Sequence, residues 1–378
     1  MKLLAVDHNA VLREDRSVYR ELVSRHMVNV SLLVPSHWIE NYSKVFYEEE
    51  KGGLQVYSSK VFFPGKPHRV MYLALRSLMM QVGPDILYVN AEPENYLSAQ
   101  AAFLRERLGL KTKIVITSYR NVDFPSGDFP YKLRAISAAC ERYVLNRVDH
   151  CIVKSQTAKD LYRQRGFLEA TVIPPAVDVH RFKKAESSDF KRKLGLAGFT
   201  IGFVGRFVEE KGVRDLLHAA NILNFPFQLL FVGRGPARKG WKELAGQLSI
   251  GDKIAWIDTV SHGEIERYLN CLDVLVLPSH STKYWKEQFG RVLIEAMACG
   301  VPVIGSDSGE IPNVIGDAGL IFHEGDSDDL CRQLQRIHDD RQLREELVQR
   351  GLDRVRKRFS TEAVAEEYLR LFQLITSV

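Results

Sequence analysis

Two glutamates flank the start of an apolar helical segment in the stretch KEQFGRVLIEAMACG, residues 286–300. Glu287 stands before a Phe-Gly pair and Glu295 after it, with seven residues between the two acids. Gly290 marks the predicted start of the helix, so Glu287 lies in the loop and Glu295 on the helix. At 1.5 Å per residue, and allowing for side-chain reach, the carboxylates stand roughly 10 Å apart. A ligand that runs from a sugar through a diphosphate to a ribose spans about that length.

The same segment has a purely structural explanation, which stays open at this point. Between the acids, the amides of Phe289 and Gly290 open a helix N-terminus that suits phosphate oxygens. Glu295 can instead pair with Arg291 one turn earlier, a contact worth only a few tenths of a kcal/mol. Glu287 can be an ordinary acid near a helix N-terminus, beside a lysine.

A second candidate phosphate site is GFVGRFVEEKG, residues 202–212, which follows an apolar strand and runs into a helix starting near Lys211. Gly202 and Gly205 let the backbone approach a ligand closely. Arg206 and Lys211 bracket the turn with two cations, and the helix N-terminus beyond offers free amides to a diphosphate. The pattern is neither a P-loop nor GxGxxG, which disfavours nucleoside triphosphates and dinucleotides. A tight turn with surface charges is the structural alternative.

Short apolar strands alternate with helical stretches along the whole chain, which predicts parallel sheets covered on both faces. The strands predicted in the first half are KLLAVD, NVSLLVP, LQVYSS, DILYVN, KIVITS, HCIVKS and TVIPP. The strands predicted in the second half are TIGFVGR, FQLLFVGR, KIAWID, DVLVLP, VPVIGS and GLIF. The fold class is therefore α/β, with two doubly wound, Rossmann-like domains facing across a cleft. Such sheets bind ligands at the carboxyl ends of their strands.

The predicted domains follow from a stretch that interrupts this alternation. From IPPAVDVHRF to KLGLAGF the chain is Pro-bearing, then charged, and lacks strand character, which is typical of a linker. We expect an N-terminal domain at residues 1–183 and a C-terminal domain at 184–359. The last segment, residues 360–378, has the apolar stripe of a helix, which we expect to pack back on the first domain.

Composition narrows the class of protein. The chain has 378 residues, 45% of them hydrophobic, and a net charge of +5, so we expect a soluble protein without a nucleic-acid partner. Five cysteines without a CxxC pair favour a reducing cytosol. The start, MKLLAVDHNAVLRED, is too short in apolar length for a signal peptide. VMYLALRSLMMQV is broken by Arg76 and predicts a buried helix, with a helix at a membrane surface as the alternative.

Two signals that can suggest metal binding have simpler explanations. The histidines show no ligand spacing such as HxxxH. DSD, residues 326–328, lies directly before a helical pattern, which favours N-capping by Asp326 over a metal site. We therefore expect no metal and no cofactor.

Taken together, these motifs resemble the retaining glycosyltransferases of family 4, which have the GT-B fold. The pieces that carry the resemblance are GFVGRFVEEKG, FVGRGP, VLVLPS, EQFGRVLIEAMACGVPVIGSDSGEIPNVI and DAGLIF, with DHCIVKSQTAKDLYRQRG and TVIPPAVDVHRF in the first half. It covers most of the chain, most densely from about residue 150 onward. The two-glutamate helix with its flanks is the most specific motif.

The resemblance implies a role for each matching residue. Arg206 and Lys211 would hold the donor diphosphate and stabilise the leaving group, and Glu287 would meet the donor sugar. Glu295 would accept the ribose hydroxyls, and the turn GRGP and the stretch WIDTV would line the base. The donor-binding set is Gly205, Arg234, Asp258, Phe289, Gly290, Arg291 and Glu295. The implied reaction is metal-independent transfer of a hexose-type sugar, with retention, from a UDP-type or GDP-type donor.

The first half departs from the pattern of the family in the loops that relatives use toward the sugar and the acceptor. The loop after the first strand carries His8 and Asn9 where relatives have paired glycines. Arg120 and Asn121 follow a later strand, where relatives place a histidine that reaches the sugar. GEIPNVI, in the second half, has Glu310 and Asn313 where a glycine and a glutamate are usual.

The acceptor, the base, the sugar and the oligomeric state are not set by the sequence. A glycan, a lipid-linked acceptor and a small molecule stay open, and Arg13, Arg16, Arg69 and Arg76 would suit an anionic or membrane-borne one. We expect a cytoplasmic protein, with peripheral attachment to the inner membrane face left open. The alternatives in function are a GT-B enzyme of another reaction, such as an epimerase or a phosphorylase, and a non-catalytic sensor of sugar nucleotides.

Overall fold

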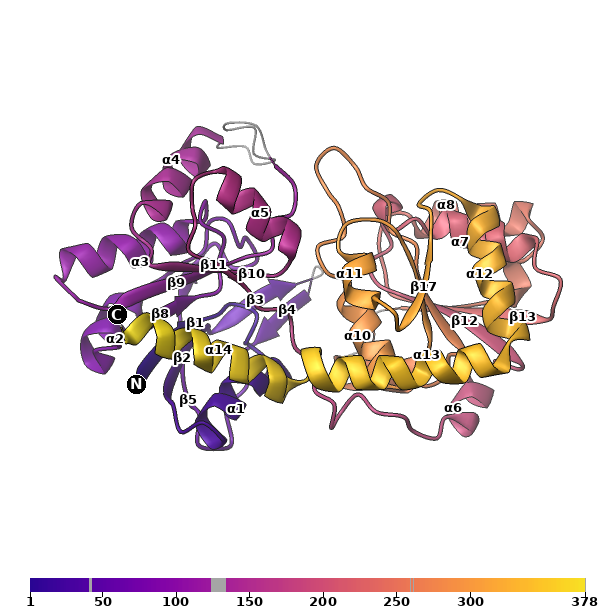
Figure 1. Ribbon diagram of the computed structural model, residues 1–378, viewed down its shortest axis with the longest axis horizontal. Coiled ribbons are helices and arrows are strands. Elements are labelled where there is room, and N and C mark those ends of the chain that lie inside the picture. The colour runs from indigo at the N-terminus through magenta and orange to yellow at the C-terminus, as the bar shows by residue number, and fades with distance from the viewer. Residues whose placement is uncertain (41–42, 124–133, 259, 261, 378) are drawn as a thin grey trace. The chain divides into compact units, whose positions relative to one another are not determined.

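A computed structural model describes residues 1–40, 43–123, 134–258, 260 and 262–377 of the chain (Figure 1). The chain forms two compact units. The N-terminal unit comprises Met1–Ala176 together with Thr361–Val378, and the C-terminal unit comprises Val177–Ser360. Among the helices of the described residues, none is both long and apolar enough to cross a bilayer.

The N-terminal unit is built on a seven-stranded parallel sheet of order β11-β10-β9-β8-β1-β2-β5. Its strands are β1 (Lys2–Val6), β2 (Asn29–Pro35), β5 (Gln55–Ser59), β8 (Ile86–Val89), β9 (Lys113–Ser118), β10 (His150–Val153) and β11 (Ala170–Val172). Two antiparallel pairs lie outside the sheet: β3 (His37–Glu40) with β4 (Ser43–Phe46), and β6 (Val61–Phe62) with β7 (Met71–Tyr72). Its helical segments are η1 (Arg13–Arg16), α1 (Ser17–Ser24), α2 (Leu75–Val82), α3 (Tyr96–Arg107), α4 (Arg134–Leu145), α5 (Gln156–Gln164) and α14 (Thr361–Thr376).

The central strands of this sheet are largely apolar because both faces are covered, whereas the edge strand β5 is mostly polar. In β1, Leu3 and Ala5 pack into one core, and Leu4 and Val6 pack into the core on the other face. The last helix, α14, supplies Phe372 and other residues to the first of these cores, and Figure 1 shows it running along one side of the sheet. A helix at the far end of the sequence is thus part of the N-terminal unit.

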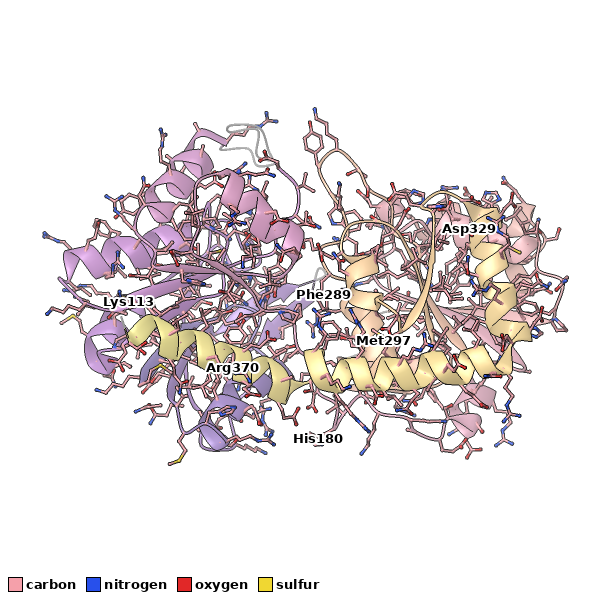
Figure 2. All side chains as sticks on the ribbon, viewed as in Figure 1. Lys113, His180, Phe289, Met297, Asp329 and Arg370 are labelled. Atoms are coloured by element: carbon pink, nitrogen blue, oxygen red, sulfur yellow. The ribbon has the colours of Figure 1, made fainter. Side chains whose placement is uncertain are left out.

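The C-terminal unit is built on a six-stranded parallel sheet of order β14-β13-β12-β15-β16-β17. Its strands are β12 (Phe199–Val204), β13 (Phe227–Val232), β14 (Ile254–Ile257), β15 (Val274–Leu277), β16 (Val303–Ser306) and β17 (Gly319–Phe322). Its helical segments are α6 (Ser188–Lys193), η3 (Glu209–Lys211), α7 (Val213–Asn221), α8 (Arg238–Gln247), η4 (Gly251–Lys253), η5 (His262–Glu264), α9 (Ile265–Leu269), α10 (Arg291–Ala298), α11 (Ile311–Ile315), α12 (Ser327–Asp339), α13 (Arg341–Arg354) and η6 (Val355–Phe359). Side chains fill the space between sheet and helices (Figure 2), where Phe289 and Met297 are both buried.

Each sheet contains a point at which the order of its strands reverses. In the N-terminal unit the chain runs from β1 outward to β2 and β5, and it then returns to the other side of β1 with β8. In the C-terminal unit it runs from β12 outward to β13 and β14, and returns to the other side of β12 with β15. Loops diverge at the carboxyl ends of the two strands at such a point and leave room for a ligand. The fold therefore predicts ligand sites at the loops after β1, β8, β12 and β15.

The predicted α/β architecture with two parallel sheets is confirmed, and every predicted strand forms. The two antiparallel pairs were not predicted, because each is short and its outer face carries apolar side chains that break the usual alternation. The segment VMYLALRSLMMQV contains the short strand β7 and then helix α2, which buries Leu75, Leu78 and Met79 but exposes Met80. The helix predicted in this segment is thus present, but only one of its faces is buried.

Candidate functional site

The loops that follow β12 and β15 bring Lys211 and Glu287 together. The Lys211 Nζ lies 2.5 Å from Glu287 Oε2, and the Ser279 hydroxyl donates to the same oxygen at 2.7 Å. Both side chains are largely shielded from water, with Lys211 13% exposed and Glu287 9% exposed. Two residues predicted from separate motifs therefore form one charged pair at the strand reversal of the C-terminal sheet.

Glycines without room for a side chain hold these loops in contact. Gly212 has φ +64°, and a Cβ there would lie 1.8 Å from the carbonyl oxygen of Pro278. Gly309 has φ +57°, and a Cβ there would lie 2.2 Å from the carbonyl oxygen of Glu287. The His280 amide donates to the carbonyl of Glu210 at 2.8 Å, which ties the two loops further. The backbone around the pair is therefore fixed by close approaches that other residue types would disrupt.

A histidine beside the pair was missed by the sequence reasoning. His280 Nε2 lies 2.5 Å from Asp215 Oδ2, and that carboxylate also accepts from the amide of Gly325 at 3.1 Å. The hydrogen bond that His280 donates to Asp215 raises the pKa of the imidazole, against the opposing effect of partial burial. The only signal in the sequence was the position of His280, three residues past the carboxyl end of an apolar strand.

The glycine-bearing turns after β12 and β13 pack backbone against backbone. A Cβ at Gly233 would lie 1.9 Å from the carbonyl oxygen of Gly205, and the amide of Phe207 donates to the carbonyl of Arg234 at 2.9 Å. Arg234 is half-buried in this arrangement. Arg206 is exposed and makes no ion pair with any part of the chain that the structure describes. The predicted cation of this turn is thus available to a ligand, while Lys211 already has a partner.

Helix α10 begins as the sequence predicts. Gly290 is its N-cap, with φ +83° and no side-chain cap. The Phe289 ring is 5% exposed and packs edge-on against Phe359 at 5.6 Å between ring centroids, so only its backbone can face a ligand. Because a helix N-terminus leaves amides without helical partners, this end of α10 suits an anion.

The competing explanation for Glu295 is present but weak. Arg291 Nη2 lies 3.8 Å from Glu295 Oε1, and the arginine side chain is 55% exposed. A pair of that length and exposure contributes only a few tenths of a kcal/mol. Glu295 itself is 16% exposed. The pairing with Arg291 therefore does not account for a carboxylate that is mostly shielded from water.

Asp258, predicted to line the base, directly follows β14 within the stretch WIDTV and pairs with Arg238 of α8. Its side chain is 73% exposed. Thr259 of the same stretch lies outside the described residues. The structure therefore places Asp258 at a surface ion pair beside the carboxyl end of β14, and its role toward a base stays a prediction.

The residues predicted for the acceptor side follow β1 and β9 in the N-terminal unit. His8 is buried, with its ring centroid 4.8 Å from that of Trp38 in β3, whereas Asn9 is exposed. Arg120 is buried and pairs with Glu141 at 2.5 Å, and Asn121 is buried as well. The histidine and the arginine thus make contacts inside the unit, and their roles toward an acceptor stay predictions.

Two acids in the loop after β8 were not singled out in the sequence. Glu92 accepts from the Ser118 hydroxyl and from the Tyr119 amide, the latter at 2.7 Å. Glu94 is 2% exposed, and burial together with the charge of Glu92 raises its pKa to about 8. These carboxyls lie at the strand reversal of the N-terminal sheet, beside the predicted Arg120. Nothing in the local pattern VNAEPENY marks a buried acid.

One minor prediction is confirmed and another is wrong. Asp326 caps α12, because its side chain accepts from the Asp329 amide at 2.8 Å. Arg16, which was expected to suit an anionic acceptor, is fully buried: it pairs with Glu50 at 3.1 Å and donates to the carbonyls of Ala10 and Val11. Its guanidinium satisfies backbone groups of the loop after β1 and cannot reach a ligand.

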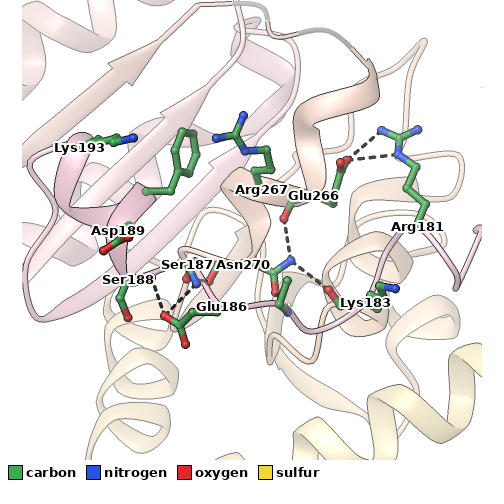
Figure 3. A pocket seen from close by; sticks show the side chains of 12 residues that line it. Arg181, Lys183, Glu186, Ser187, Ser188, Asp189, Lys193, Glu266, Arg267 and Asn270 are labelled. Atoms are coloured by element: carbon green, nitrogen blue, oxygen red, sulfur yellow. Dashed lines mark hydrogen bonds and ion pairs between the residues drawn. The ribbon is translucent and has the colours of Figure 1, made fainter.

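A cavity of about 390 Å³ lies elsewhere in the C-terminal unit, between the segment that precedes α6 and helix α9 (Figure 3). Its polar groups largely bond one another: Arg181 pairs with Glu266 at 3.1 Å, and the Asn270 amide donates to the carbonyls of Lys183 and Glu266. It contains none of the residues predicted for the donor. We interpret it as a recess between this segment and the rest of the C-terminal unit, to which the segment is bonded.

Models of known protein families match both halves of the chain. The family model "Glycosyltransferase Family 4" matches residues 17–181, and "Glycosyl transferases group 1" matches residues 185–354. The chain is 28% identical over 312 residues to N-acetyl-alpha-D-glucosaminyl L-malate synthase of Bacillus anthracis, which is 78% of this chain and 77% of that protein. It is 29% identical over 233 residues to D-inositol 3-phosphate glycosyltransferase of Mycolicibacterium gilvum, which is 57% of this chain and 50% of that protein.

Solved structures extend the similarity to the whole fold. Sucrose-phosphate synthase from Thermosynechococcus elongatus matches with a TM-score of 0.73 at 19% identity, over 100% of this chain and 99% of that chain. An Anabaena protein solved in complex with UDP and glucose matches with a TM-score of 0.73 at 16% identity, over 100% of both chains. At such identities the match shows the fold.

Proposed function

The chain belongs to the glycosyltransferases of family 4, which have the GT-B fold, and we propose that it transfers a hexose-type sugar with retention of configuration. The donor would be a nucleotide-diphosphate sugar bound by the C-terminal unit. The acceptor would be a hydroxyl of a glycan, a lipid-linked molecule or a small metabolite, bound by the N-terminal unit. We place the reaction in the cytoplasm and without a metal ion.

The observation that carries the proposal is the meeting of Lys211 and Glu287 at the strand reversal of the C-terminal sheet, 2.5 Å apart. The same loops carry Arg206, an exposed cation with no ion pair among the described residues, and the helix N-terminus at Gly290. A diphosphate needs cations and amides, and a sugar needs a carboxylate that accepts from its hydroxyls. The C-terminal unit offers all of these on loops that leave the same edge of its sheet.

The proposed chemistry is the departure of a nucleoside diphosphate from the anomeric carbon. The bond from that carbon to the phosphate oxygen breaks, and a bond to the acceptor oxygen forms on the same face of the sugar. The acceptor proton leaves with the diphosphate. Negative charge grows on the phosphate as the bond breaks, so Lys211, Arg206 and the amides at Gly290 would act by electrostatic stabilisation. Glu287 would orient the sugar, and Glu295 would accept from the ribose hydroxyls.

The names of the curated relatives support sugar transfer to small acceptors, since they include an N-acetyl-alpha-D-glucosaminyl L-malate synthase and a D-inositol 3-phosphate glycosyltransferase. A nucleotide-sugar epimerase, a phosphorylase and a non-catalytic sensor remain as alternatives. The test begins with a thermal-shift panel of nucleoside diphosphates and UDP-, GDP- and ADP-sugars on the full chain. A single base and sugar should raise the melting temperature above all others.

Turnover of the selected donor then separates the alternatives. We expect release of the nucleoside diphosphate, and NMR of the product should show the anomeric configuration of the donor. Unchanged turnover in EDTA is expected for a metal-independent reaction. Donor binding without turnover, tested against glycan, lipid-linked and small-molecule acceptors, would favour a sensor. Conversion of the donor to its epimer would favour a nucleotide-sugar epimerase. Release of a sugar phosphate would favour a phosphorylase.

A further inference from the structure

Five large apolar side chains are exposed on neighbouring hairpins of the N-terminal unit. Ile39 and Phe46 belong to the pair β3–β4, and Phe62, Phe63 and Leu73 lie on or next to the pair β6–β7. Their exposed fractions range from 45% to 63%. We call these five residues the apolar patch. A soluble protein seldom leaves several such side chains exposed together unless they contact a partner or a membrane.

The two hairpins that form the patch touch each other. Gly65, in the turn of the second hairpin, packs so closely on the first that a Cβ there would lie 2.7 Å from the Cβ of Ile39. Within β3, Trp38 faces the core, so the neighbouring Ile39 faces outward because side chains alternate along a strand. Phe62 pairs with Met71 across β6–β7. The two hairpins that carry the patch are therefore in direct contact.

The backbone holds one member of the patch in a strained conformation. Phe63 has φ +55°, in the left-handed region that a bulky residue rarely adopts. Its ring is nevertheless 48% exposed, so packing of the ring inside the protein does not explain the strain. Strain of this kind persists where the surrounding structure imposes it, and it is frequent at functional positions.

Cations without partners surround the patch. The Lys44 Nζ lies 4.8 Å from the centre of the Phe46 ring, and Lys60 and Lys66 are exposed on the second hairpin. Within the described part of the chain, none of these three lysines forms an ion pair. From residue 52 to residue 84 the sequence carries four cations, Lys60, Lys66, Arg69 and Arg76, and no acid. The second hairpin thus carries positive charge that no acid of its own stretch offsets, whereas the first hairpin carries Glu40 next to Ile39.

We propose that the apolar patch and its lysines dock the N-terminal unit on an anionic lipid surface. Protein interfaces are enriched in aromatic residues, methionine and arginine and depleted of lysine. The phenylalanines of the patch suit either kind of surface, whereas the exposed lysines beside them favour lipid. Lysines near an anionic membrane are attracted to its surface potential, and apolar side chains beside them enter the boundary between headgroups and acyl chains. The composition of the patch therefore fits lipid better than protein.

Vesicle binding by the full chain tests this proposal without any need for sugar transfer, so it can fail while the proposed function stands. The probe is a vesicle of phosphatidylcholine with phosphatidylglycerol, compared with phosphatidylcholine alone. Because each cation near the surface adds about fivefold to partitioning, Lys60→Glu/Lys66→Glu should weaken binding by at least about 25-fold. Phe62→Ser/Phe63→Ser should weaken it by about tenfold or more, because apolar insertion is lost.

The matched control is Arg107→Glu/Lys111→Glu, which makes the same change of charge at exposed positions near the amino ends of the strands in the same unit. An unchanged melting temperature shows that each variant is folded. Binding of anionic vesicles that the hairpin variants lose and the control keeps would support the proposal. Absence of binding, equal binding to neutral vesicles, or an equal loss in the control would overturn it.

Discussion

Lys211→Ala tests whether the ion pair with Glu287 acts in catalysis or only joins two loops. The pair is short, at 2.5 Å, and its members are 13% and 9% exposed. Removal of the lysine leaves a largely buried carboxylate without its cation, which should cost about 2–4 kcal/mol, less than for a fully buried pair because some solvent contact remains. For a domain of this size, that loss lowers the melting temperature by about 5–15 °C.

A role in catalysis predicts an effect beyond stability. If Lys211 stabilises charge on the departing diphosphate, kcat should fall by about 10²–10³, as for the loss of one preorganised charge or donor at a transition state. Donor affinity should fall less, by about tenfold, because the charge on the ground-state diphosphate is smaller. Steady-state kinetics and calorimetric donor titration, both run well below the melting temperature of the variant, measure the two quantities separately.

Lys191→Ala is the matched control for this experiment. Lys191 pairs with Asp273 at 2.9 Å in the same unit, with both groups partly shielded, and Asp273 precedes the amino end of β15. The control should lose stability and keep its kcat. Equal small losses of kcat and affinity in Lys211→Ala, no larger than in the control, would refute the role in leaving-group departure. A double variant with Glu287→Gln should regain about 1 kcal/mol, since the uncompensated charge is gone.

Further predictions concern the helix, the glycines and a buried acid. Glu295→Ala should weaken donor binding at least about tenfold by calorimetry, whereas loss of the weak pair in Arg291→Ala should leave stability within about 0.5 kcal/mol. Gly212→Ala should cost about 3 kcal/mol or more in denaturant unfolding, or prevent folding, while Gly198→Ala, at φ +71° with open space around it, should cost about 1 kcal/mol. Glu94 keeps its proton in the folded chain up to a pKa of about 8 and loses it near 4.5 when unfolded, so stability should fall between those pH values. Glu94→Gln should flatten that dependence in melting curves.

The sequence predicted the fold well because its strands are buried on both faces. Apolar runs such as ILYV and VLVL are typical of strands buried on both faces. Their alternation with helices predicts a parallel sheet. The prediction of family and fold is confirmed by the family matches and by structures that share the fold. The hairpins were missed because their strands are too short for a periodic pattern, with four residues each in β3 and β4 and two each in β6 and β7.

The local geometry around the proposed donor site was predictable for a related reason. Gly205, Lys211 and Gly290 sit where strands end and helices begin, and the geometry of such junctions is nearly invariant. The contact between Lys211 and Glu287 was not predictable, because the order of β12 and β15 in the sheet decides it. His280 and Asp215 escaped notice for the same reason, since only the folded chain brings them within 2.5 Å.

The acceptor half was harder to predict because its side chains are positioned by irregular segments. His8 follows β1, yet its ring packs on Trp38, which belongs to a hairpin that the parallel sheet does not require. Changes in that hairpin can therefore reorient the loop after β1 while the C-terminal unit, with its own core, stays as it is. The motifs that carry the family resemblance are accordingly dense in the second half of this chain, where glycines and charges at strand–helix junctions set the geometry. They are sparse in the first half, where hairpins and loops position the side chains.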